Sequence, residues 1–83
     1  MGTDEADPVK AIVRAILEHL HSQPLAADSA EGVARWWLGP AHARVTEEQV
    51  AEALDLLVEG QQMRRLRLLD GTFLYLQVPP TRQ

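Results

Sequence analysis

Residues 46–62 constrain the fold of this chain more than any other stretch, because they carry a helix signal at both ends. Thr46 suits the N-cap position, and Gln49 three residues later completes a capping box. Gly60 can adopt the left-handed conformation that ends many helices. We therefore predict a helix that begins at Thr46 and ends at Gly60.

This predicted helix has one apolar face and one acidic face. At about 100° per residue, one side gathers the apolar residues, which are Val50, Ala53, Leu54, Leu57 and Val58. Four carboxylates fall within about 60° of one another on the opposite side. These residues, called the acidic stripe below, are Glu48, Glu52, Asp55 and Glu59. No Lys or Arg lies between residues 46 and 62, so the helix itself offers the stripe no basic partner.

Length and composition indicate one small globular domain. The chain has 83 residues, of which 46% are hydrophobic and 24% charged, a balance typical of globular rather than disordered proteins. We predict a domain at 7–78 between tails at 1–6 and 79–83. The absence of cysteine excludes disulfides and thiolate metal sites. The polar, acidic N-terminus does not resemble a signal peptide, and no apolar run approaches the roughly 20 residues of a membrane span, so we expect a cytoplasmic protein.

Charge is distributed unevenly along the chain. The net charge is −4, but residues 1–63 hold four basic and eleven acidic groups, whereas residues 64–83 hold four basic groups and one acidic group. An acidic body with a basic C-terminal part is therefore expected. Nucleic acid would be repelled by the first part and attracted by the second.

The first predicted helix covers residues 8–21. Asp7 suits its N-cap and Pro8 its first helical position. Its buried stripe is predicted from the helical period to be Val9, Ile12, Val13, Ile16, Leu17 and Leu20.

A second, shorter helix is predicted after a possible short strand at residues 25–27. Asp28 suits its N-cap, with Glu31 at the capping-box position. The residues expected to face inward are Ala30, Val33, Ala34 and Trp37. Trp36, about 100° away from Trp37, is expected either to be exposed at an interface or to cover the gap between the first two helices. Gly39 and Pro40 stop this helix.

Leu69, Asp70 and Gly71 signal a hairpin between two apolar runs. A two-residue turn would pair Leu68 with Phe73, whereas a three-residue turn with Gly71 in a bulge would pair Leu66 with Leu74. Because burial selects the register, we predict the bulged turn, which separates the two faces cleanly. The side chains predicted to point inward are Leu66, Leu68, Leu74 and Leu76. Those predicted to point outward are Arg65, Arg67, Phe73 and Tyr75.

The order of elements is therefore helix, short strand, helix, helix and hairpin, an α+β arrangement. This order, the TEEQVAEALDLLVEGQ helix and the RRLRLLDGTFLYL hairpin resemble the winged-helix (winged helix-turn-helix) superfamily over residues 7–78. The resemblance implies three helices followed by a C-terminal β-hairpin wing, in the order α-β-α-α-β-β. It also implies that the third helix and the wing are the binding surfaces, because members of the superfamily use both to bind DNA or protein.

Two groups of residues are candidate binding sites. The acidic stripe is either a solvated face or a functional surface that docks a protein partner or mimics DNA, and Trp36 would add to a docking surface. Reading of a DNA major groove by four carboxylates conflicts with the phosphate charge. The wing residues either stabilise an exposed hairpin face or contact a protein or a nucleic acid. These wing residues are Arg64, Arg65, Arg67, Phe73 and Tyr75.

The sequence offers no sign of catalytic chemistry. His19 and His21 are two residues apart on a helix and cannot hold one metal ion, and His42 stands alone, so neither metal nor cofactor is expected. Ser22 and Ser29 have no visible base partner. We predict a non-enzymatic module, monomeric or weakly homodimeric, that binds an unidentified protein partner and no membrane. The alternatives are a DNA-binding regulator that contacts the duplex through the basic wing, and a small subunit or adaptor of an enzyme complex.

Overall fold

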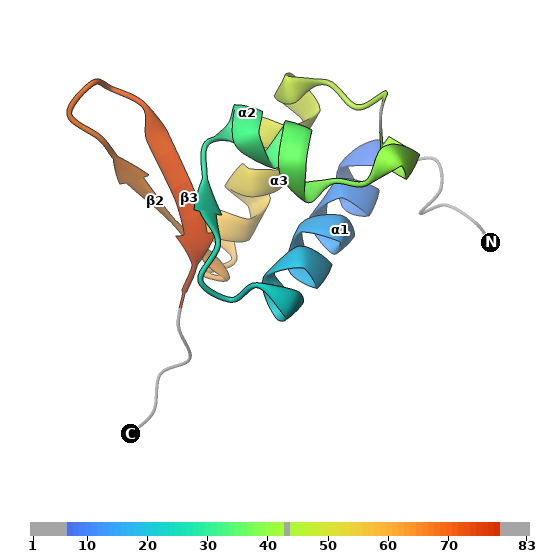
Figure 1. Cartoon of the computed structure of the whole chain (residues 1–83), viewed down its shortest axis with the longest axis horizontal. Coiled ribbons are helices and arrows are strands. Elements are labelled where there is room, and N and C mark those ends of the chain that lie inside the picture. The colour runs from blue at the N-terminus through green and yellow to red at the C-terminus, as the bar shows by residue number, and fades with distance from the viewer. Residues whose placement is uncertain (1–6, 43, 79–83) are drawn as a thin grey trace.

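Helices pack against one face of a small antiparallel sheet, and the hairpin of strands β2 (Met63–Arg67) and β3 (Phe73–Gln77) projects beyond them (Figure 1). The computed structural model of the protein describes residues 7–42 and 44–78, and the predicted tails at 1–6 and 79–83 lie outside the described residues. The elements are α1 (Pro8–Ser22), β1 (Ala27–Asp28), α2 (Ala30–Gly32), the π-helix η2 (Val33–Trp37), the 3-10 helix η3 (Pro40–His42), α3 (Glu47–Glu59), β2 (Met63–Arg67) and β3 (Phe73–Gln77). The predicted α+β class with three helices is confirmed.

Helix α1 begins and ends close to the predicted positions. The Asp7 carboxylate accepts hydrogen bonds from the backbone N–H groups of Val9 and Lys10, which satisfies donors that a helix N-terminus leaves free. The stripe predicted from the sequence faces the core, with Ile12, Ile16 and Leu20 fully buried. Helix α1 packs against α3, and the core between the helices and the sheet consists of Ile12, Ile16, Leu20, Val33, Trp37, Leu38, Val50, Ala53, Leu54, Leu57, Met63 and Tyr75.

The start of the second helix differs from the prediction. Asp28 does not cap α2, because it belongs to β1 and pairs with Tyr75 of β3. Ser29 is the N-cap, and its hydroxyl accepts a hydrogen bond of 3.1 Å from the Gly32 N–H group. The predicted capping box is therefore absent, and Glu31 forms an ion pair of 3.1 Å with Arg35 instead. Gly32 suits this place because a Cβ atom there would collide with the Asp28 carboxylate.

Helix α3 has the predicted capping box and a C-terminus that differs from the prediction. Gly60 has φ −81°, and the left-handed residue is Gln61, with φ 63°. The Gln61 N–H group donates to the Val58 carbonyl oxygen (3.0 Å) and the Gln62 N–H group to that of Leu57 (2.9 Å). This pair of bonds is a Schellman motif whose left-handed position falls on glutamine. The helix extends one residue too far for Gly60 to occupy that position.

Replacing Gln61 by glycine should stabilise the protein. A side chain at positive φ is strained, so Gln61→Gly should raise the free energy of unfolding by about 0.5–1 kcal/mol. Urea denaturation measures this change. Gln62→Gly is the matched control, because Gln62 does not have positive φ and should gain nothing. A Gln61→Gly variant no more stable than the original chain would contradict the expectation.

The sheet has the strand order β1-β3-β2 and the hairpin register predicted from the sequence. Leu66 pairs with Leu74 and Arg65 with Tyr75. The turn has three residues: the Leu68 N–H group donates to the Thr72 carbonyl oxygen at 2.7 Å, and Gly71 has φ +90°. The short strand predicted at residues 25–27 is shifted by one to two residues and pairs with β3.

The two faces of the hairpin are reversed relative to the prediction. Met63, the first residue of β2, is buried in the core directly after the Schellman motif. Because side chains alternate along a strand, Arg65 and Arg67 share the face of Met63, and Leu66 shares the opposite face. Tyr75, opposite Arg65, is therefore buried, whereas the leucines predicted to point inward form the outer face of the sheet.

Candidate functional site

The acidic stripe lies on the solvent side of α3. Val50, Ala53, Leu54 and Leu57 are buried, and this orients all four carboxylates of the stripe away from the core. Glu48, Glu52, Asp55 and Glu59 are exposed, as the helical period predicts. Within the described residues, Asp55 is the only one of the four that has an ion pair. The stripe therefore keeps most of its negative charge.

Arg65 links the hairpin to α3. Its guanidinium group lies 3.6 Å from the Asp55 carboxylate, and both side chains are about half exposed. The same guanidinium group lies over the Phe73 ring, 4.7 Å from the ring centre. An exposed ion pair contributes about 0–1 kcal/mol, and an exposed cation–π contact about 0.5–1 kcal/mol. Arg65 thus has two contacts within the protein, although its side chain is still about half exposed.

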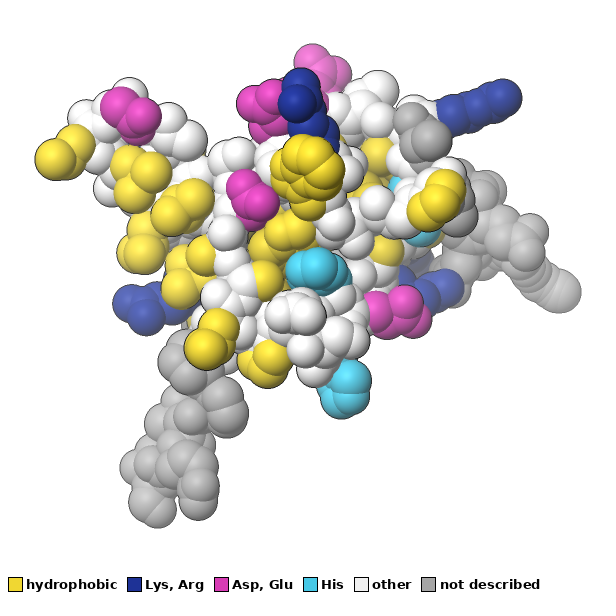
Figure 2. Space-filling view, in the orientation of Figure 1, with side chains coloured by type: hydrophobic (Ala, Val, Ile, Leu, Met, Phe, Trp, Pro, Cys, Tyr) yellow, Lys and Arg dark blue, Asp and Glu magenta, His cyan; other side chains and the backbone are white. Residues whose placement is uncertain are grey.

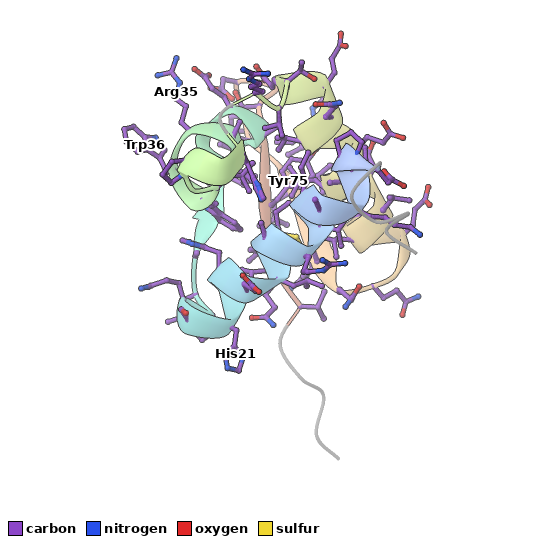
Figure 3. All side chains as sticks on the ribbon, turned by 90° about the vertical axis from the view of Figure 1, so that its right-hand side faces the viewer. His21, Arg35, Trp36 and Tyr75 are labelled. Carbon is purple, nitrogen blue, oxygen red and sulfur yellow. The ribbon has the colours of Figure 1, made fainter. Side chains whose placement is uncertain are left out.

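The predicted wing residues do not form one surface. Arg65, Arg67 and Phe73 lie on the face of the hairpin that turns toward the helices, whereas Arg64 pairs with Leu76 and lies on the outer face. Tyr75 was predicted to be exposed, but it is only 6% exposed and belongs to the core. Figure 3 shows its side chain between the helices and the sheet. The basic side chains of β2 are thus divided between two faces.

Trp36 is an exposed aromatic side chain, separate from the stripe and the hairpin. It is 73% exposed, so the interpretation that it covers the gap between the first two helices is wrong. Figure 3 shows Trp36 and Arg35 pointing away from the molecule. Trp37 next to it is buried, and its ring stacks on the His19 ring with 4.6 Å between centres.

A row of exposed leucines is the feature that the sequence interpretation missed. Leu66 and Leu68 are 43% and 39% exposed, and Leu74 and Leu76 on the neighbouring strand are partly exposed. Figure 2 shows hydrophobic side chains along the hairpin. Met63 is the residue in the sequence that could have predicted this exposure, because its burial determines which side of β2 faces inward.

A shallow cleft of about 300 Å³ opens between the hairpin and the first turns of α2 and α3. It is lined by Ser29, Ala30, Glu31, Glu47, Gly71, Thr72, Phe73 and Tyr75. The Ser29 hydroxyl is occupied as the N-cap of α2, and Glu31 is paired with Arg35. The lining of the cleft therefore combines the aromatic residues Phe73 and Tyr75 with polar residues, among them Glu47.

Asp70 holds the hairpin turn in shape. Its carboxylate accepts a hydrogen bond of 2.9 Å from the Thr72 N–H group. Hydrogen bonds from the Thr72 backbone and side chain lower the pKa of Asp70 below its ordinary value. The turn thus places a carboxylate, ionised at neutral pH, at the far end of the hairpin.

No three His, Asp or Glu side chains among residues 7–42 and 44–78 come together as metal ligands would. In the same part of the chain, no helix combines the length and the apolar character needed to cross a bilayer.

Comparison with models of protein families, with curated proteins and with solved structures finds no match to this chain. The site must therefore be interpreted from its own geometry.

Proposed function

We propose that this chain is a non-enzymatic winged-helix module that binds another protein through the acidic stripe of α3. The order of elements, the sheet order β1-β3-β2 and the projecting hairpin support the winged-helix assignment. In helix-turn-helix proteins the helix at the place of α3 is the recognition helix. A module that keeps this geometry but changes the charge of its recognition surface is suited to a different kind of partner.

The exposed carboxylates of the stripe are the observation that carries this proposal. Glu48, Glu52 and Glu59 have no ion pair within the described residues, and the Asp55–Arg65 pair neutralises only one charge of the four. A surface of this kind attracts a basic segment of a partner protein and directs its approach, because complementary charges steer association. Phosphate groups would meet repulsion at the same place.

The alternative, a DNA-binding regulator, has less support. Contact with the duplex through the wing needs Arg64, Arg65 and Arg67 on one surface, but Arg64 lies on the opposite face from the other two. The guanidinium group of Arg65 is also held by Asp55 and Phe73. Arg67 alone would leave a single phosphate contact on that face, whereas specific binding usually draws on several.

Capture of partners from a cell lysate tests the proposal. Glu52→Lys should reduce recovery of the bound protein by at least about tenfold, since it puts a positive charge in the middle of the stripe. Glu18→Lys on α1 is the matched control, because it changes an exposed helical glutamate by the same charge away from the stripe. Equal recovery with both variants would show that the stripe is not the docking surface.

Binding to duplex DNA separates the two functions. The original chain should not bind at low salt, where electrostatic attraction is strongest. The triple variant Glu48→Lys, Glu52→Lys, Glu59→Lys should gain salt-dependent binding, because it replaces repulsion by phosphate contacts. Fluorescence anisotropy of a labelled duplex measures both. Salt-dependent binding by the original chain would favour the DNA-binding alternative.

A further inference from the structure

The outer face of the sheet is apolar and has nothing packed on it within the described residues. Leu66, Leu68, Leu74 and Leu76 alternate with the inward side chains of β2 and β3, so they form one continuous face. The helices cover the opposite side of the sheet (Figure 1). We call these four side chains the leucine face. The solvent face of an antiparallel sheet is usually polar, and contiguous exposed apolar patches commonly mark contact surfaces.

We propose that the leucine face binds the leucine face of a second copy of this chain. The two sheets lie face to face, related by a two-fold axis that runs between them and perpendicular to the strands. Such an axis reverses the strand direction, so the hairpin turn of one copy lies over the base of the hairpin of the other. A closed two-fold dimer requires a patch that complements itself, and the leucine face meets this requirement in two ways.

The first is the charge at the two ends of the face. Arg64 lies on the outer side at the base, opposite Leu76, and Asp70 lies in the turn at the far end. They are six residues apart, which in a fully extended chain would be at most about 20 Å. An axis near their midpoint brings each Arg64 to the Asp70 of the other copy. A parallel arrangement would instead place Arg64 against Arg64 and Asp70 against Asp70, which like charges disfavour.

The second is the position of the two most exposed leucines of the described chain. Leu69 in the hairpin turn is fully exposed, and Leu25 in the turn before β1 is 96% exposed. They lie at opposite ends of the sheet, because β1 pairs with the base of β3. The same axis brings Leu69 of one copy toward Leu25 of the other, so both lose contact with water. The same two-fold axis thus covers the leucine face, pairs the charges at its two ends and brings the exposed leucines of the two turns together.

Pairing through the free edge of β2 is a poorer way to join two copies. This edge strand carries Arg64, Arg65 and Arg67, and an antiparallel pair of such strands would bring arginines side by side. Basic residues on an edge strand oppose edge-to-edge association. The face, rather than the edge, is therefore the surface that a second copy can cover.

Dimerisation through the leucine face is independent of the proposed protein-binding function. The acidic stripe belongs to α3, and its Asp55 contacts Arg65, which lies on the inner face of the hairpin. A dimer joined through the outer face leaves both stripes exposed. Loss of one activity would therefore leave the other measurable.

Sedimentation equilibrium over about a hundredfold range of protein concentration tests the proposal. The mass of the original chain should rise toward that of two copies.

Leu66→Glu should raise the dissociation constant at least about 100-fold, because it buries a charge in the apolar contact. Leu56→Glu is the matched control: Leu56 is 48% exposed, but it lies on α3, so its dimer should persist. Circular dichroism confirms that both variants are folded. A chain that stays monomeric, or equal loss in both variants, overturns the proposal.

A mixing experiment tests the antiparallel arrangement. Arg64→Glu alone should be monomeric, since each introduced carboxylate would meet an Asp70 of the other copy. Asp70→Lys alone should also be monomeric, since each introduced ammonium group would meet an Arg64. An equimolar mixture should form heterodimers, in which one end pairs Arg64 with Asp70 and the other pairs the two introduced charges of opposite sign. Native mass spectrometry distinguishes the heterodimers from monomers and from homodimers of either variant by mass. Two variants that remain monomeric when mixed overturn the arrangement.

Discussion

Replacing Trp37 by alanine should lower the free energy of unfolding by about 3–5 kcal/mol, the usual loss for a large aromatic side chain in a core. Trp37 is 8% exposed and ends the π-helix η2. Its ring stacks on His19 of α1, so it joins two helices that the sequence separates. In a domain of 83 residues such a loss is a large part of the total stability.

Trp36 provides the control for this experiment. It is the neighbouring residue, has the same side chain, and is 73% exposed. Trp36→Ala should therefore change the free energy of unfolding by less than about 1 kcal/mol. Denaturation by guanidinium chloride, followed by far-ultraviolet circular dichroism, measures both variants without depending on the lost tryptophan fluorescence. Similar losses for the two variants would mean that the burial of Trp37 is not what the structure describes.

Tyr75→Ala should be nearly as damaging, with a loss of about 3–5 kcal/mol. Tyr75 is the buried side chain at the centre of β3, between β1 and β2. Phe73, two residues earlier on the same face, is the control. It is 39% exposed and lies where the hairpin leaves the helices, so Phe73→Ala should cost about 1 kcal/mol.

This comparison decides between the two possible orientations of the hairpin. If Tyr75 pointed outward, as the alternation of leucines predicts, Tyr75→Ala would be mild, and Leu74→Ala would be the severe substitution. Thermal unfolding of the three variants at low protein concentration measures the difference without a contribution from dimerisation. A severe Leu74→Ala and a mild Tyr75→Ala would contradict the described structure.

The features predicted correctly from the sequence are those determined by short-range signals. The Asp7 cap with Pro8, and the capping box of Thr46 with Gln49, depend on residues within one helical turn. The hairpin register was predicted because a three-residue turn places the leucines on one face and the other side chains on the opposite face, and Gly71 supplies the positive φ in that turn. The acidic stripe follows from the period of a helix whose buried face is unambiguous.

The features missed depend on contacts between distant residues. Asp28 and Ser29 are both good N-caps, and the choice between them is made by the pairing of Asp28 with Tyr75, almost fifty residues later. The orientation of the hairpin depends on where Met63 enters the core. The four alternating leucines predicted that their own face points inward. The burial of Met63 sets the opposite orientation, because one buried residue determines which way every other side chain of the strand points.

The Schellman motif at the end of α3 has a consequence for how the length of this chain can vary. Only Gly60, Gln61 and Gln62 separate the last residue of α3 from buried Met63. Adding or deleting one residue among these three would turn the other face of the hairpin toward the helices, which would expose Met63 and Tyr75 and bring Arg64 and the leucines inward. By contrast, the turn at residues 69–71 connects strands that are already oriented, so extra residues there would be accommodated. We therefore expect natural relatives to differ in length at the hairpin turn and to keep the connection after α3 constant.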